Sequence, residues 1–110
     1  MAVVQTNWQS ALNVSGSVVT LATGGASGSA ISSIYLANTN TTTPRYVTVL
    51  AKGTGISAAN KIVPTIEIPP NDFYLLDLAN CPIILKVSET LRLYQDTGTD
   101  ITATAFGMDF

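Results

Sequence analysis

Short runs of alternating or β-branched residues fill this chain from residue 30 to its end, and each run stops at Gly, Pro or Asn. No window of about 11 residues combines helical apolar spacing with capping residues, so stable helices are not expected. Seven or eight short strands in about 80 residues predict an all-β fold, an antiparallel β-sandwich of immunoglobulin-like or jelly-roll character. The predicted strands in this part are residues 31–38, 46–52, 61–68, 73–78, 83–87, 91–94 and 101–110.

Two of these runs predict further detail. Pro64 cannot donate a ladder hydrogen bond, so residues 61–68 should form an edge strand, a bulged strand or partly a loop. In residues 46–52, Val47 and Val49 share one face and alternate with Tyr46, Thr48 and Leu50 on the other. In the last run, Ile101, Ala103 and Ala105 alternate with Thr102, Thr104, Phe106 and Met108.

Residues 1–29 differ from the rest of the chain in composition and strand pattern. They predict an N-terminal arm that precedes a sandwich domain of residues 30–110. Residues 3–8 and 17–21 have strand composition but no partner at hairpin spacing, and the Gly-rich stretch 24–29 predicts a flexible loop. Apolar residues on such an arm need cover, which strand addition to a neighbouring subunit provides. The predicted interface residues are Val3, Val4, Trp8, Val18, Val19 and Leu21. The alternative is that they supply the first strands of their own sandwich.

The charge content is low for a freely diffusing domain. Only 11% of the 110 residues are charged, against roughly 25% in average soluble domains, and mean hydropathy is +0.34. His is absent, and 5 Lys or Arg oppose 7 Asp or Glu. These counts disfavour His-based catalysis, most zinc sites and a basic nucleic-acid footprint. We therefore expect no enzymatic activity, no cofactor, no metal and no nucleic-acid partner.

Other potential sites have simpler interpretations. No two carboxylates are paired as an acid and a base, and Asp96 and Asp100 flank Gly98 in what we interpret as a plain turn rather than a Ca²⁺ loop. Cys81, the single cysteine, is expected to be a small buried hydrophobe. The chain shows neither a secretory signal pattern nor an apolar run long enough for a membrane span, so no membrane partner is expected.

Threonine supplies a neutral, β-compatible surface in place of Lys and Glu, which suits permanent contact with other proteins. A stable, poorly charged monomer is the alternative. The threonines in question are Thr39, Thr41, Thr42, Thr43, Thr97, Thr99, Thr102 and Thr104.

The aromatic residues favour packing between strands, and the competing hypothesis is a stacking platform in a small carbohydrate-binding module. That platform would use Trp8, Tyr35, Tyr46, Tyr74 and Tyr94.

The order of the strand motifs resembles small β-sandwich virion proteins of tailed bacteriophages over about three quarters of the chain. The motifs are Ile31-x-x-Ile34-x-Leu36-x-Asn38, Pro44-x-x-Val47-Thr-Val49, residues 66–70, Tyr74-Leu75-Leu76, Ile83-Ile84-Leu85, residues 88–93 and Thr102-Ala-Thr104. Glu89-Thr90 stands where such proteins often have Gly-Asp.

This resemblance implies a non-enzymatic structural protein of a phage particle, assembled in the host cytoplasm and located in the virion. It implies foremost a capsid decoration (cement) protein that binds the shell of the major capsid protein, and alternatively a neck, collar or tail component. The implied partners are the major capsid protein or other virion proteins, and further copies of the chain in a homo-oligomer.

Overall fold

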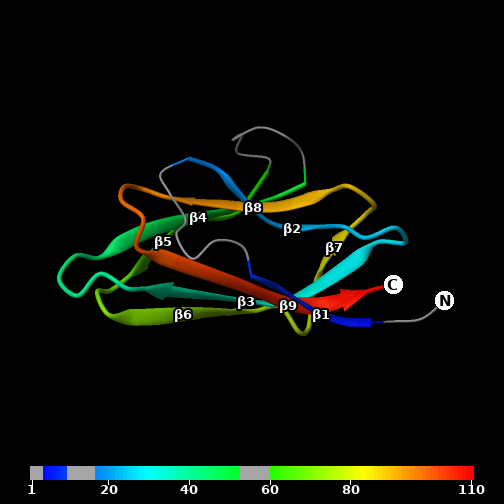
Figure 1. Cartoon of the computed structure of the whole chain (residues 1–110), viewed down its shortest axis with the longest axis horizontal. Coiled ribbons are helices and arrows are strands. Elements are labelled where there is room, and N and C mark those ends of the chain that lie inside the picture. The colour runs from blue at the N-terminus through cyan, green and yellow to red at the C-terminus, as the bar shows by residue number, and fades with distance from the viewer. Residues whose placement is uncertain (1–3, 10–16, 53–59) are drawn as a thin grey trace.

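The computed structural model describes residues 4–9, 17–52 and 60–110, and it has no α-helix in these ranges. Two antiparallel sheets pack face to face, as Figure 1 shows. The described strands are β1 Val4–Gln9, β2 Val19–Thr23, β3 Ser29–Asn38, β4 Arg45–Ala51, β5 Lys61–Ile68, β6 Asp72–Asp77, β7 Ile83–Leu85, β8 Thr90–Gln95 and β9 Ile101–Asp109. The predicted all-β sandwich is confirmed.

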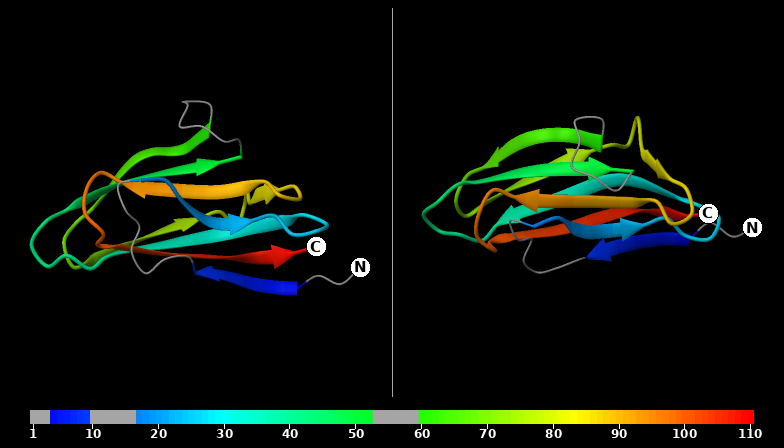
Figure 2. Two further views of the ribbon diagram at one scale, coloured as in Figure 1. Left: turned by 45° about the horizontal axis from the view of Figure 1, so that its top comes forward. Right: turned by 90° about the horizontal axis from the view of Figure 1, so that it is seen from above.

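Sheet A has the order β1-β9-β3-β6, and the short strand β7 pairs with the beginning of β3. Sheet B has the order β2-β8-β4-β5. In the right view of Figure 2, which looks from above, sheet B lies over sheet A. The strands at the edges are therefore β1, β6 and β7 in sheet A and β2 and β5 in sheet B.

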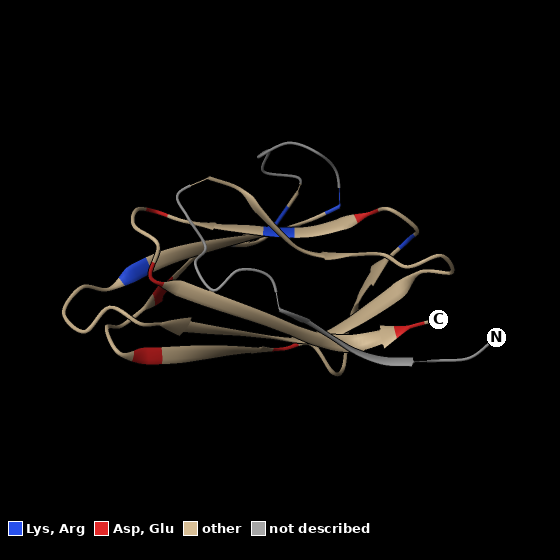
Figure 3. Cartoon of the chain, in the orientation of Figure 1, with Lys and Arg blue, Asp and Glu red and all other residues tan. Residues whose placement is uncertain are grey.

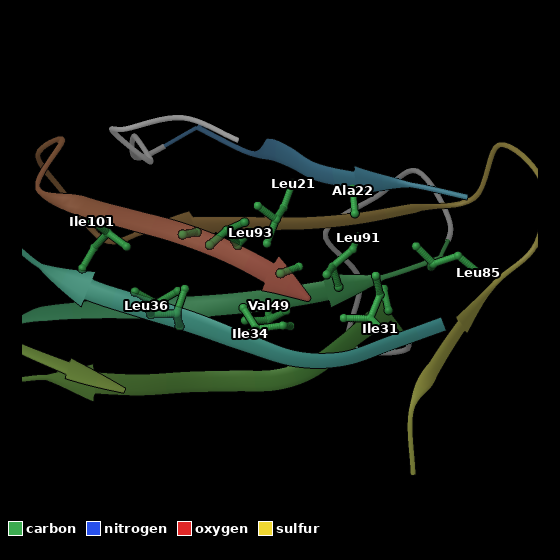
Figure 4. Packing of buried hydrophobic residues seen from close by; sticks show 14 of the residues in the cluster. Leu21, Ala22, Ile31, Ile34, Leu36, Val49, Leu85, Leu91, Leu93 and Ile101 are labelled. Carbon is green, nitrogen blue, oxygen red and sulfur yellow. The ribbon is translucent and has the colours of Figure 1, made fainter. Parts of the chain in front are cut away.

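The hydrophobic core lies between the sheets and is built from both (Figure 4). A register shift in β3 between Ile31 and Ser33 turns both Ile31 and Ile34 inward, although they are three residues apart. In β9 the alternation is regular, with Ile101, Ala103 and Ala105 buried as the sequence predicts. The buried cluster consists of Leu21, Ala22, Ile31, Ile34, Leu36, Val47, Val49, Ala51, Ile68, Leu85, Leu91, Leu93, Ile101, Ala103 and Ala105.

The strand that contains Pro64 is an edge strand, as predicted. β5 pairs only with β4 in sheet B, and the register between these two strands shifts twice, beside Val49. An edge position accommodates proline because one side of the strand makes no ladder hydrogen bonds.

The two N-terminal strands both pair within the sandwich. β1 pairs along its whole length with β9, and β2 pairs with β8, where Leu21 and Ala22 join the core. Residues 19–23 thus follow the alternative that the sequence leaves open, in which they form a strand of their own sandwich. The boundary that we expected at residues 29 and 30 falls inside β3. Val3 lies outside the described residues.

The Gly-rich turn between β2 and β3 is tied by hydrogen bonds, contrary to the flexible loop that we expected. Gly24 N–H donates to the Glu89 carbonyl (2.8 Å), and Gly28 N–H donates to the Gly25 carbonyl (2.9 Å). A Cβ at Gly24 would lie 2.0 Å from the Lys86 carbonyl oxygen. Glycine is needed here for close backbone approach rather than for flexibility.

Asn38, the last residue of β3, holds two turns together from a buried position. Its Nδ2 donates to the carbonyls of Thr43 and Ile68, both at 3.0 Å, and its Oδ1 accepts from Asn40 N–H at 2.9 Å. One side chain therefore connects the β3–β4 turn to the end of β5 in the opposite sheet.

Candidate functional site

The outer face of sheet A is formed by residues that the strand register places side by side. Tyr35 in β3 lies between Leu75 in β6 and Thr104 in β9. In the next row, Ala37 lies between Phe73 and Thr102. Since side chains alternate across a strand, both rows point away from the buried cluster.

Large apolar side chains remain accessible across this face. Their exposed fractions run from 37% to 55%, and the rings of Tyr35 and Phe73 stack with centroids 5.2 Å apart and an interplanar angle of 15°. An apolar group of this extent is unusual on a soluble monomer and is typical of an interaction surface. We call these six residues the open face: Tyr35, Phe73, Leu75, Ile84, Phe106 and Met108.

The charges are distributed unequally between the sheets (Figure 3). The strands of sheet A contain no Lys or Arg among residues 4–9, 29–38, 72–77, 83–85 and 101–109, and their only charged residues are Asp72, Asp77 and Asp109. The strands of sheet B contain Arg45, Lys61, Glu67 and Arg92. The open face is therefore nearly neutral, with its carboxylates at strand ends.

The outer face of sheet B has a different character. Thr48 and Leu50 alternate with the inward Val47 and Val49 of β4, as the sequence predicts. Both are nevertheless buried on the outer side of the sheet. Tyr46 at the beginning of β4 is exposed, and its hydroxyl donates to Glu67 Oε2 at 2.8 Å. This hydrogen bond and the nearby carboxylate charge raise the pKa of Tyr46 above 10.0. Besides the exposed apolar side chain of Ile62 in β5, sheet B thus presents polar and charged groups at accessible positions such as Tyr46 and Glu67.

Only part of the predicted interface coincides with accessible surface. Leu21 is buried in the core, and Val18 and Val19 are half-buried, with Val19 packed against the core cluster. The backbone positions of Val4 and Trp8 pair with β9, and their side chains lie outside what the structure describes.

The predicted threonine surface occupies two regions. Thr102 and Thr104 are half-buried on the outer face of sheet A, and the other six threonines are exposed in the β3–β4 and β8–β9 turns. The open face itself was not predicted from the sequence. The sequence does contain a signal for it. The alternation of β9 places large apolar residues, Phe106 and Met108, on the side that faces away from the core.

The carboxylates of the Asp96–Asp100 turn have protein partners. Asp96 Oδ1 accepts from Tyr46 N–H at 3.2 Å, and Asp100 Oδ2 lies 2.6 Å from Arg45 Nη2 and 2.7 Å from Arg45 Nε. The hydrogen bonds from Arg45 and Asn40 hold the pKa of Asp100 below its ordinary value, against a smaller opposing effect of burial. This geometry favours the interpretation as a structural turn. No group of three or more potential metal-binding side chains occurs in the described part of the chain.

Cys81 is exposed, so the expectation that it is a buried hydrophobe is wrong. Its N–H donates to the Leu78 carbonyl at 3.1 Å in the β6–β7 turn, and the next strand begins only at Ile83. Cys81 therefore precedes the apolar run that we expected to bury it.

The aromatic side chains do not form one platform among the tyrosines whose side chains are described. Tyr35 lies on the outer face of sheet A, Tyr46 lies on β4 of sheet B, and Tyr74 alternates with the outward residues of β6.

Within the described ranges, the structure contains no helix that could cross a membrane. Comparison with protein families, with curated proteins and with solved structures finds no match to this chain.

Proposed function

We propose that this chain is a non-enzymatic structural protein of a phage particle, and foremost a capsid decoration protein that binds the major capsid protein shell through the open face. The observation that carries the proposal is the nearly neutral apolar outer face of sheet A. Phe106 and Met108 offer area for desolvation without a charge that must lose its hydration. The virion context comes from the resemblance of the strand motifs.

Two further observations support a binding role over catalysis. Both carboxylates of the Asp96–Asp100 turn have protein partners, and the chain has no His to activate a nucleophile. The low charge content of 11% is consistent with a surface that is covered by neighbours in an assembly.

The test is binding of the purified protein to phage shells that lack it, measured by co-sedimentation. Phe106→Glu should abolish binding, because it places a charge within the open face while leaving the core intact. Val87→Glu is the matched control, since Val87 is an equally apolar exposed residue in the β7–β8 turn. Equal binding by both variants, with both folded, would refute the role of the open face.

Copy number separates the proposed location from the alternative. A capsid decoration protein should occur in hundreds of copies per particle, whereas a neck, collar or tail component occurs in about a dozen or fewer. Quantitative mass spectrometry of purified virions provides this number. Absence from the virion would contradict both locations.

A further inference from the structure

The edge strands of the sandwich differ in their protection against pairing with another chain. β5 carries Pro64, the terminal Lys61 and two register shifts, and β2 has a register shift between Thr20 and Ala22. β6 contains no proline and no lysine, its six residues pair with β3 in unbroken register, and its charges, Asp72 and Asp77, lie only at its two ends. Proline, lysine and bulges are the means by which natural edge strands avoid association, so β6 is open to strand addition.

The hydrogen-bond pattern shows which groups of β6 face outward. Leu78 N–H donates to the Ser32 carbonyl at 2.8 Å, in line with the register of the β3–β6 pair. Because bonded and non-bonded pairs alternate along an antiparallel ladder, the N–H and C=O groups of Phe73, Leu75 and Asp77 point away from β3. In agreement, Phe73 N–H donates at 2.7 Å to the carboxylate of its neighbour Asp72.

We propose that β6 is a homodimerisation edge, at which β6 of a second copy adds antiparallel across a two-fold axis through Leu75. Leu75 N–H then donates to the carbonyl of Leu75 of the second copy, and the reverse bond forms by symmetry. The two copies of sheet A become one continuous sheet, and the open faces of both copies lie on the same side of it. This inference does not depend on the phage assignment.

The side chains of β6 are self-complementary in this register. On the outer side Leu75 meets its own copy, and on the core side Tyr74 stands opposite the partner's Leu76. Asp77 stands opposite the partner's Phe73, so no carboxylate faces a carboxylate. A two-fold axis through Tyr74 would instead place Asp72 against the partner's Leu76, and cross-linking at position 75 distinguishes the two registers.

The accessible area sets the strength of the dimer. Phe73 is 55% and Leu75 is 51% exposed, and together with Tyr74 they offer roughly 250 Å² per copy, to which the backbone edge adds. This is below the roughly 800 Å² per partner of standard stable interfaces. The dimer is therefore weak and reversible, and multivalent attachment to an assembly would strengthen it.

Sedimentation equilibrium tests the dimer. The wild-type protein should shift from monomer to dimer between about 10 µM and about 1 mM, and Leu75→Pro should stay monomeric. Proline at position 75 removes an N–H that makes no bond to β3, so the fold tolerates it. Leu75→Lys is the second variant, which retains the N–H and adds charge, and it should weaken association at least tenfold.

Phe106→Lys is the matched control, since Phe106 lies on the open face but on β9, with β3 between it and β6. It should dimerise like the wild type while losing attachment to shells, which separates this proposal from the proposed function. A wild type that stays monomeric at about 1 mM, or equal weakening by Phe106→Lys, would overturn the β6 edge.

Disulfide trapping tests the register. In a Cys81→Ser background, Leu75→Cys should form a covalent dimer on oxidation, because Cα atoms of a hydrogen-bonded antiparallel pair are about 5.5 Å apart. Phe106→Cys in the same background should remain reduced. Failure of Cys at position 75 to cross-link, or equal cross-linking at position 106, would contradict the two-fold axis through Leu75.

Discussion

The two outer faces of the sandwich are made by strands of similar sequence, but their outward apolar side chains differ in exposure to solvent. On sheet A, Phe106 and Met108 of β9 remain accessible, whereas on sheet B the outward Leu50 and Thr48 of β4 are buried. All Lys and Arg residues of the described strands lie in sheet B, and sheet A is charged only by aspartates. The outward side chains at the centre of β4 are therefore part of the stable fold, while the apolar outer side of sheet A is available for a partner.

The difference has an energetic meaning. Burying a large apolar side chain contributes about 1.5–3 kcal/mol relative to leaving it exposed. Leu50 has gained this contribution within the monomer, but Leu75 and Phe73 are about half exposed and retain about half of theirs for association. A substitution on one face should consequently act on folding, and the same kind of substitution on the other face should act on assembly.

The largest expected effect comes from truncating one leucine on each face. Leu50→Ala should lower the free energy of unfolding by about 3 kcal/mol, because it empties a fully buried site. Leu75→Ala should lower it by less than about 1 kcal/mol, since half of that side chain is already in water. Urea denaturation at about 5 µM, below the expected dimerisation range, measures both. Equal losses would abolish the distinction between the faces.

The alternating pattern could predict the sandwich but not which face stays open. Outward Thr48 and Leu50 in β4 resemble outward Thr104 and Phe106 in β9, and local sequence gives no reason for their different burial. That difference depends on what packs over each sheet, which is a non-local property. The edge position of β5, in contrast, was predictable because Pro64 acts through its own backbone.

The N-terminal strands and Cys81 show the same limit. β2 finds its partner β8 about seventy residues later in the chain, so no hairpin spacing could reveal it. The glycines of residues 24–28 have the composition of a flexible loop, yet Gly24 is fixed by the close approach of Lys86. The glycine content of this stretch thus suggested a flexible backbone, whereas the fold requires glycine there because no larger side chain would fit.

A second, smaller effect tests what holds the open face in shape. Gly107 lies in β9 between Phe106 and Met108, and a Cβ there would lie 1.9 Å from the Ala30 carbonyl oxygen of β3. Gly107→Ala should therefore cost about 2–3 kcal/mol and disturb the pairing of β9 with β3. Thermal denaturation measures the loss.

Gly25→Ala is the matched control for this substitution. Its Cβ would meet side-chain atoms rather than backbone, Asp109 Oδ1 at 3.2 Å and Ser29 Oγ at 3.6 Å, and the loss should stay below about 1 kcal/mol. A Gly107→Ala variant as stable as Gly25→Ala would show that β9 can shift, and that the open face is not rigidly fixed.

A third substitution acts between the faces and should increase stability. Gln95 of β8 is fully buried, and neither of its side-chain amide atoms has a hydrogen-bond partner in the part of the chain that is described. Gln95→Met keeps the shape and removes the desolvation cost, so we expect a gain of about 1 kcal/mol in chemical denaturation. Gln95→Glu should instead destabilise, because it buries a charge. A loss of stability in Gln95→Met would mean that the amide is satisfied.

The smallest effect concerns the ion pair that links the two sheets. Arg45 begins β4 of sheet B, and Asp100 directly precedes β9 of sheet A. Because hydrogen bonds from Arg45 and Asn40 lower the pKa of Asp100, the folded state favours the carboxylate over its protonated form. Its contribution to stability is complete at pH values well above the ordinary pKa of 3.8, and it is lost as the pH falls through the lowered pKa of the folded state. Asp100→Asn should flatten this part of the stability profile between neutral and strongly acidic pH, while Glu89→Gln, a control in the β7–β8 turn, should leave it in place. An unchanged acid profile in Asp100→Asn would show that the Arg45–Asp100 ion pair does not contribute to stability at this end, where Asn38 also bridges the sheets.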